Sequence, residues 1–526
     1  MGGEVKEVIY DRISLIMELE KEIYKICKPL KNHIDKLWIE NVFYVVWAYI
    51  NNSQFNNEFP EDIEVIDEIK NAKSIHEKGM YDWELSFLVR ECLRFSQDTK
   101  NMSRENVNKY SYFSSAINKI KDLEGNIYNL IKQEDFWKVE FRRIAHKQFV
   151  WQFKLTDSDV LRYFKIYNNP KVSNFVKEKV GITTRQWYVI GTASMGAILK
   201  NPKFNVDSDI KISDITIKEC NIFFEFVSAN IDTIKDKLSS IKYDENYLYG
   251  LNPLEYYPLV RVGNYYYCPI VNFLFWRITS GLYFDLIKGD NNGSFGRAFG
   301  SAFQDYLMEL SQNILLDKDK TKTIPEHEYY VGKAKKDSVD IILKQKDAMF
   351  FVEAKAKRMQ INSKTQLIKN ESMDKDLNIL ADDIFQIYQT MKDYLDGMYT
   401  NIDAGEYKIY PLLVTLEDWY LIGEDLLELK ERVKRKLIEN SLSEDFLVKF
   451  PFSICSTRNY ELLLQLIDNN DISKVMDEWH VPERNGHDFG NFIVTHKNLK
   501  YRPLVYFFPE EFESIYPKRD APSQNP

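Results

Sequence analysis

Three residues in the stretch 337–358, Asp340, Glu353 and Lys355, have types and a spacing that could do chemistry on a phosphate ester. Side chains two residues apart on a strand project to the same face, so Glu353 and Lys355 would lie side by side. A polar turn at residues 344–347 separates two apolar runs, and a hairpin there would bring Asp340 alongside them. Burying such charged groups is costly unless a cation or a substrate uses them.

The chemistry open to this trio is metal-assisted hydrolysis. Two carboxylates on adjacent strands offer hard oxygen ligands for Mg²⁺ or Mn²⁺. Such an ion can lower the pKa of a water molecule and stabilise the charge that develops on a phosphodiester. A lysine on the same face, here Lys355, can hold or deprotonate the attacking water or offset that charge.

Segments with clear periodicity surround the predicted hairpin and are expected to position it. Apolar residues at spacings of three and four predict helices, and short apolar runs predict strands. The expected elements are a helix over 294–315, strands over 327–332, 338–343 and 349–355, a helix over 376–395, a strand over 410–416, a helix over 424–440, a strand over 451–456 and a helix over 459–467. This order predicts an α/β domain with a mixed sheet flanked by helices.

A chain of 526 residues is longer than one core usually organises, so the sequence predicts several domains. We expect a mainly α-helical region over 1–245, a connector over 246–290 with a hairpin turning at Gly263, the α/β domain over 291–470, and a C-terminal extension over 471–526 that ends in a disordered tail. The helical region contains no Gly-rich phosphate loop and is expected to serve regulation or recognition.

Charge and composition exclude several classes of protein. The net charge is −9, which argues against a polycation that coats nucleic acid, yet residues 318–369 carry 13 Lys/Arg against 7 Asp/Glu. A basic segment on an otherwise acidic protein is consistent with local binding of an anionic substrate. No apolar run is long enough for a membrane span, and the start has neither a signal-peptide nor a myristoylation pattern. Five scattered cysteines without a CxxC unit predict a reducing, cytoplasmic location.

The stretch around the trio resembles the PD-(D/E)XK nuclease superfamily, which has the restriction-endonuclease-like fold. Asp340 matches the motif aspartate, residues 353–355 match the (D/E)-x-K element, and the flanking elements match an αβββαβ core. The resemblance covers residues 294–468 and does not reach the first 245 residues. It implies a Mg²⁺- or Mn²⁺-dependent nuclease in which Asp340, Glu353 and the backbone carbonyl of Ala354 bind the metal and Lys355 serves the attacking water.

Many members of this superfamily carry another acid on the helix before the sheet, in a G-x-x-F-E-x-Y setting. This chain has Gln304 at that position. Either Gln304 is a neutral ligand, or Asp305 or Glu309 substitutes for the missing acid, or metal binding is weaker.

The expected substrate is DNA in preference to RNA. Phosphate contacts position a nucleic acid without reading its sequence, and basic residues near the motif could make them. The candidates are Lys333, Lys335, Lys336, Lys357 and Arg358. A helical module fused to such a nuclease suggests, by analogy, prokaryotic restriction or anti-phage defence, with a homo-oligomer or a partner protein bound through the helical region.

Two alternatives of other classes remain. The chain could be a catalytically inactive nuclease-fold module that binds nucleic acid or protein, for which Gln304 is the best support. It could also be a nucleotidyltransferase, because a Gly-Ser segment at 191–196 precedes Asp207 and Asp209; Glu225, which would be the third carboxylate, falls in a predicted helix. His480, His487 and His496 have no zinc-site spacing and are not assigned a metal.

Overall fold

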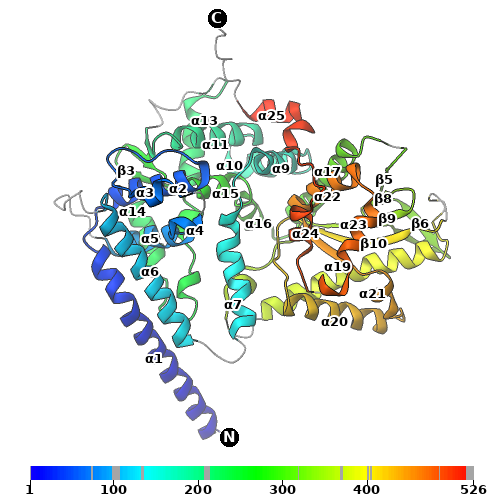
Figure 1. Ribbon diagram of the computed structural model, residues 1–526, viewed down its shortest axis with the longest axis horizontal. Coiled ribbons are helices and arrows are strands. Elements are labelled where there is room, and N and C mark those ends of the chain that lie inside the picture. The colour runs from blue at the N-terminus through cyan, green and yellow to red at the C-terminus, as the bar shows by residue number, and fades with distance from the viewer. Residues whose placement is uncertain are drawn as a thin grey trace, which may run out of the picture. The chain divides into compact units, whose positions relative to one another are not determined.

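The chain folds into two compact units, each built from segments that are distant in sequence (Figure 1). The first unit contains residues 1–156, 174–289 and 510–526, and the second contains residues 157–173 and 290–509. The computed structural model describes residues 2–72, 75–96, 107–131, 136–205, 212, 214–317, 319–367, 371–399, 402, 405–484 and 486–516. The predicted regions follow one another along the chain, whereas these units alternate along it.

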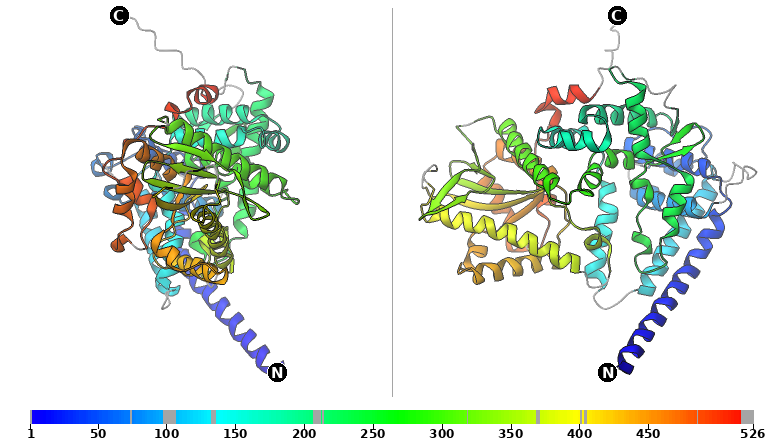
Figure 2. Two further views of the ribbon diagram at one scale, coloured as in Figure 1. Left: turned by 90° about the vertical axis from the view of Figure 1, so that its right-hand side faces the viewer. Right: turned by 180° about the vertical axis from the view of Figure 1, so that it is seen from behind.

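The first unit is mainly helical, as the sequence predicts. Its helices are α1 (Gly2–Ile34), α2 (Ile39–Phe55), α3 (Asp67–Lys70), α4 (Ile75–Lys78), α5 (Asp82–Phe95), α6 (Tyr110–Ile131), α7 (Phe136–Ile144), α8 (Val150–Gln152), α10 (Ser173–Val180), α11 (Thr184–Ile198), α13 (Ile217–Val227), α14 (Ile231–Ser239), α15 (Val271–Ile278), α16 (Leu282–Ile287) and α25 (Pro509–Ile515). Helix α1 extends beyond the rest of this unit (Figure 2). Among the described residues, no helix is both long and apolar enough to cross a membrane.

A small sheet completes the first unit, with strand order β1-β4-β3-β2. The predicted hairpin is present as β3 (Leu259–Val262) and β4 (Tyr265–Tyr267), with Gly263 at φ +59° in the turn. Glycine adopts this left-handed conformation without the Cβ clash that other residues meet. Strands β1 (Lys203–Phe204) and β2 (Ser228–Asn230) flank the hairpin, so it belongs to the first unit and forms part of its sheet.

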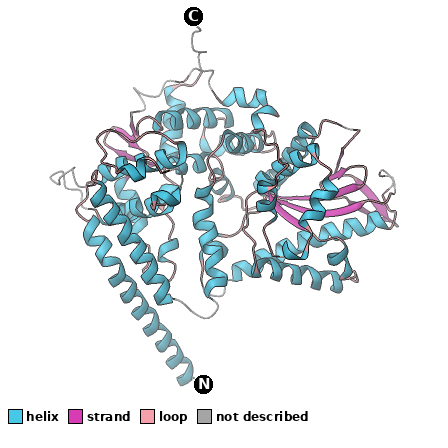
Figure 3. Cartoon of the chain, in the orientation of Figure 1, coloured by secondary structure: helices cyan, strands magenta, loops and turns pink. Residues whose placement is uncertain are grey.

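The second unit contains a mixed sheet, drawn in magenta in Figure 3. Its five strands follow the order β11-β10-β9-β8-β5. Its strands are β5 (Lys322–Pro325), β8 (Ile341–Lys344), β9 (Ala348–Lys355), β10 (Lys408–Thr415) and β11 (Ser453–Ser456). Strands β9, β10 and β11 are parallel, and β8 and β5 are antiparallel to their neighbours. Seven of the eight residues of β10 are buried, as expected for a strand covered on both faces. The structure therefore agrees with a helical region followed by an α/β domain.

One predicted strand pairs elsewhere. The strand expected over 327–332 is present as β6 (Glu328–Val331), but it pairs with β7 (Ala334–Asp337) in a separate two-stranded sheet. The strand that joins β8 in the main sheet is β5, which the periodicity does not predict. It has four residues and ends at Pro325, which fits the sheet edge because proline cannot donate a ladder hydrogen bond.

Helices cover both faces of the main sheet. Helices α19 (Glu371–Leu395) and α20 (Glu424–Glu439) pack together, with α19 against β9 and β10, while α17 (Ser294–Ile314) and α22 (Thr457–Asn469) contact the sheet as well. The other α-helices among the described residues of this unit are α9 (Asp157–Asn168), α18 (Ile361–Thr365), α21 (Asp445–Lys449), α23 (Ile472–Trp479) and α24 (Phe489–Thr495). The predicted helices over 294–315, 376–395 and 424–440 are thus confirmed.

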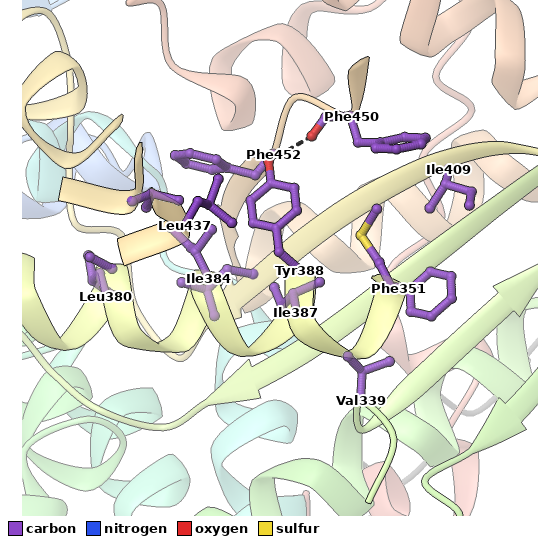
Figure 4. Packing of buried hydrophobic residues seen from close by; sticks show 14 of the residues in the cluster. Val339, Phe351, Leu380, Ile384, Ile387, Tyr388, Ile409, Leu437, Phe450 and Phe452 are labelled. Carbon is purple, nitrogen blue, oxygen red and sulfur yellow. Dashed lines mark hydrogen bonds between the residues drawn. The ribbon is translucent and has the colours of Figure 1, made fainter. Parts of the chain in front are cut away.

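The core between α19 and the sheet is apolar. Phe351 of β9 packs with Ile384, Ile387 and Tyr388 of α19, all of which are fully buried (Figure 4). The Tyr388 hydroxyl donates a hydrogen bond of 2.7 Å to the Phe450 carbonyl, which satisfies its one polar group inside this core. The spacing of three and four on α19 therefore selects the helix face that covers the sheet.

Helix α9 joins the second unit through a buried ion pair. Arg162 donates to both carboxylate oxygens of Glu461 on α22, at 2.5 and 2.8 Å, and to Asp159 at 2.8 Å. The Tyr306 hydroxyl of α17 donates to the same Glu461 at 2.8 Å. A buried pair with this many hydrogen bonds compensates the desolvation of its charges. Sequence spacing does not reveal this link, which joins residues 299 positions apart.

We expect Ile387→Ala to lower the free energy of unfolding by about 2–5 kcal/mol, because it empties a site in the core of α19. Ile438→Ala on α20 is the matched control, since that side chain is 55% exposed. Urea unfolding of both variants measures the difference. Equal losses in the two variants would contradict the assignment of α19 as the core-facing helix.

Candidate active site

The antiparallel pairing of β8 and β9 brings the predicted trio together. Ile341 pairs with Val352, so Asp340, which immediately precedes β8, lies level with Glu353 of β9. The sequence places Asp340 on the first strand; the structure places it one residue before that strand begins. Glu353 and Lys355 project to the same face, because the Lys355 Nζ lies 2.8 Å from Glu353 Oε1.

Asp340 is held at both carboxylate oxygens. The Ala354 backbone N–H donates to Oδ2 at 2.6 Å, and the Gln304 Nε2 of α17 donates to Oδ1 at 2.7 Å. The backbone carbonyl of Asp340 accepts from the Glu326 N–H at 2.9 Å, which ties it to the end of β5. Asp340 is therefore a buried and fixed carboxylate.

Lys355 bridges two carboxylates. Besides Glu353, its Nζ lies 3.5 Å from Asp383 Oδ1 on α19. Sequence reasoning missed Asp383. A signal for it exists, because Asp383 stands three residues after Leu380 and four before Ile387 and so shares the inward face of an otherwise apolar helix stripe.

Burial dominates the electrostatics of this cluster. It raises the pKa of Asp340, and the nearby charge of Glu353 raises it further; burial also raises the pKa of Glu353 against the opposing effect of Lys355. Burial, partly offset by Lys355, raises the pKa of Asp383 to about 6. Burial and the charges of Asp337 and Glu353 raise the pKa of Glu326.

Desolvation would lower the pKa of Lys355, but the charges of Glu353 and Asp383 outweigh this effect and raise that pKa to about 12. The cluster thus holds more acidic groups than one lysine can pair with, and burial disfavours their ionised forms.

The residues present fit a divalent cation of the magnesium type. Two adjacent carboxylates whose ionised forms are disfavoured would gain from a cation between them. Mg²⁺ is commonly bound through one or two carboxylates, with water and substrate oxygens completing its shell. Within the described ranges no group of three or more His, Cys, Asp or Glu side chains could hold a metal ion, so Asp340 and Glu353 are not part of a larger acidic cage. The Gln304 amide also carries an oxygen that a rotated side chain could offer.

Of the three accessory candidates, the structure brings Gln304 to the trio. Asp305 instead pairs with Lys171 at 2.7 Å, and Glu309 pairs with Lys165 at 2.7 Å. Both acids therefore stabilise the contact between α17 and the segment containing α9.

The five basic candidates differ in their surroundings. Lys333, Lys335 and Lys336 are exposed on the β6–β7 hairpin, where Lys335 pairs with Glu328 and Lys336 lies 2.7 Å from Asp393. Lys357 is half-buried in the segment after β9. Arg358 is buried, with its guanidinium 3.4 Å from Glu417, and so presents little surface to a substrate.

The segment that resembles a nucleotidyltransferase motif has a structural role in helix α11. The Gly-Ser segment at 191–196 lies inside α11, so the predicted turn is wrong. A Cβ at Gly191 would lie 2.9 Å from Ile278 Cδ1, which shows that this glycine permits close packing of α11 against α15. Glu225 lies on α13, capped by Thr216 as predicted. Asp207 and Asp209 lie outside the described residues, as does the predicted C-terminal tail.

Comparison of this chain with protein-family models, with curated proteins and with solved structures found no match in any of the three.

In a metal-free buffer, wild-type protein should lose more stability on raising the pH than Asp340→Asn does. The folded-state pKa of Asp340, about 8, lies above its ordinary 3.8, so its stabilising contribution is complete below about pH 4 and is lost as the pH rises through about 8. Urea unfolding with a chelator at about pH 5 and about pH 8.5 measures the two slopes.

The control for this pH experiment is Asp396→Asn, which removes an exposed carboxylate near the end of α19 and should keep the wild-type slope. If Asp340→Asn also kept that slope, Asp340 would be ionised in the folded protein at both pH values.

Proposed function

We propose that the chain is a Mg²⁺- or Mn²⁺-dependent nuclease that hydrolyses phosphodiester bonds of DNA. The observation that carries the proposal is the cluster of Asp340, Glu353 and Lys355 at the end of β9, with the Gln304 amide on Asp340. Burying two carboxylates and a lysine destabilises the fold through the desolvation of their charges. A metal ion bound for hydrolysis would offset that cost.

In the proposed reaction, Asp340, Glu353 and the Ala354 carbonyl would hold the metal ion. When bound, the ion supplies a Lewis acid for the scissile phosphate and a lowered pKa for water. Lys355 stays protonated at neutral pH, because its pKa is raised, and therefore acts by holding the attacking water or by offsetting the charge on the phosphate. Glu353 and Asp383 orient its ammonium group from two sides.

DNA is the proposed substrate on the basis of charge. The β6–β7 hairpin belongs to the same unit as the carboxylates and carries Lys333, Lys335 and Lys336. Exposed lysines can contact backbone phosphates of a nucleic acid without selecting a sequence. A role in prokaryotic restriction or anti-phage defence is consistent with such an enzyme and rests on analogy with the resembled superfamily.

The second candidate is an inactive module that keeps this arrangement to bind nucleic acid. The amide of Gln304, where related nucleases carry an acid, favours it because an amide contributes no charge to metal binding. Binding without hydrolysis would distinguish this candidate from the enzyme.

Purified protein with Mg²⁺ or Mn²⁺ should cleave DNA, and Asp340→Ala and Lys355→Ala should each lower the rate by about 10²- to 10⁴-fold. The first substitution removes a metal ligand, and the second removes the cation that holds the water. Gel assays on plasmid, linear and single-stranded DNA and on RNA measure the rate and the substrate preference.

Matched controls for the cleavage assay are Lys346→Ala, an exposed lysine in the turn of the same hairpin, and Asp396→Ala. Both should cleave at the wild-type rate. Cleavage that survives both site substitutions contradicts the site, and DNA binding without cleavage under either metal supports the inactive module.

Asp383→Asn should slow cleavage by about 10- to 100-fold, since it removes a group that orients Lys355 without touching the metal. The alkaline limb of the pH–rate profile should move to lower pH, because Asp383 helps to raise the pKa of Lys355. Its neighbour Asp382, which pairs with Lys436 and is 62% exposed, gives the control Asp382→Asn. An unchanged profile in Asp383→Asn would show that this carboxylate has no positioning role.

A further inference from the structure

A cavity of about 420 Å³ lies in the second unit at the carboxyl ends of β10 and β11. Thr415 and Ser456, the last residues of these parallel strands, form part of its wall, together with residues 418–421. Trp479 and Phe489 line it from the C-terminal part of this unit. Its volume falls in the range of small-molecule sites, which often lie at the carboxyl ends of parallel strands.

Aromatic rings form much of the wall. Trp419 is 3% exposed, and Trp479 packs on Phe489 with ring centroids 5.0 Å apart. His480 also lines the cavity and stacks on Tyr410. Such surfaces favour a flat ligand that stacks on rings.

Two carboxylates supply acceptors among these rings. Asp418 accepts a hydrogen bond from Asn459 Nδ2 at 3.2 Å, and Asp488 caps α24 by accepting from the Asn491 N–H at 2.6 Å. Burial, with the charge of Asp488 adding to it, raises the pKa of Asp418 to about 6, so its ionised form still predominates at neutral pH. Ser456 also forms a side-chain hydrogen bond with Asp418, and the two oxygens of a carboxylate still offer about four acceptor sites in all.

Two buried ring nitrogens belong to residues of the same wall. Over the part of the chain that the structure describes, neither Trp419 Nε1 nor His480 Nε2 has a hydrogen-bond partner, and both atoms are buried. Burial lowers the pKa of His480 to about 4, so its ring is neutral at physiological pH. Leaving such groups unpaired has a penalty that a ligand with acceptors and donors would remove.

The backbone at this wall is also unusual. Tyr420 has φ +46°, a left-handed conformation that a bulky side chain rarely adopts. Strained residues of this kind concentrate at ligand sites, where the surrounding structure holds them in place.

We propose that this cavity binds a nucleobase that presents N–H donors at one edge, with guanine as the best match. Asp418 would accept the adjacent N–H groups of that edge, Trp419 would donate to a ring acceptor, and the aromatic wall would stack on the plane. An organic cation matches less well, because Lys430 and Arg484 line the same cavity and balance Asp418 and Asp488 in charge.

This base site does not depend on the proposed hydrolysis. Among the described residues, Asp340, Glu353 and Lys355 are not part of the cavity wall. The base could come from a free nucleoside or from a nucleic-acid strand, and the chemistry that would recognise it is the same for both.

Isothermal titration of the full-length protein with guanosine, adenosine, cytidine and uridine tests the site. Guanosine should bind at least about tenfold more tightly than uridine, since a carboxylate discriminates donor edges by such a factor. A parallel titration with an oligonucleotide that carries one unpaired guanine separates the sources: tighter binding of the strand identifies a strand base, and weaker binding identifies the free nucleoside. Equal affinity for all four nucleosides, or no binding, would overturn the proposal.

Three variants localise the binding to this cavity. Asp418→Asn keeps the bond from Asn459 but presents a donor to the base edge, and Trp419→Phe removes the ring N–H; each should weaken guanosine binding about tenfold. Val448→Trp narrows the rim at a side chain that is 85% exposed and should block binding without unfolding the chain. Asp396→Asn, an exposed carboxylate outside the wall, is the control and should bind as wild type. Unchanged guanosine affinity in Val448→Trp would place the bound base elsewhere.

Discussion

The burial of Asp340 beside Glu353 is the constraint on which the second unit depends. Two carboxylates that would repel one another are held level by the pairing of β8 with β9, and the Ala354 N–H and the Gln304 amide hold Asp340 from two sides. Helix α17 supplies Gln304, and α19 supplies the carboxylate that steadies Lys355. The helices on the two faces of the sheet therefore act as supports for one charged cluster as well as covers for an apolar core.

Much of the second unit could be predicted, because its long elements have strong periodicity. Helices α17 and α19 and strands β9 and β10 follow from apolar spacing, and the strand pair brought the three charged residues together as predicted. Strand β5 could not be predicted, since four residues ending in Pro325 show no alternation. The spacing of α19 places Asp383 on the inward face, but only the fold shows that Lys355 lies opposite it.

The ion pairs between residues that are distant in sequence could not be predicted. No local pattern shows that Arg162 pairs with Glu461 or that Asp305 and Glu309 meet Lys171 and Lys165. The charge count of the basic segment could not show that Arg358 is buried against Glu417. Residue type predicts that a charge needs a partner, but only the fold determines which partner it finds.

The alternation of the two units along the chain has a consequence for biosynthesis. On the ribosome, Arg162 emerges long before Glu461, and the last helix of the first unit, α25, emerges after the second unit is complete. The last residue of α25, Ile515, accepts a hydrogen bond of 3.1 Å from Thr192 Oγ1. The first unit is therefore complete only when the last described residues have been synthesised. A fragment that begins at residue 290 would leave Glu461 buried without its arginine, a loss of about 3–5 kcal/mol. No continuous stretch of the chain therefore contains one whole unit without part of the other.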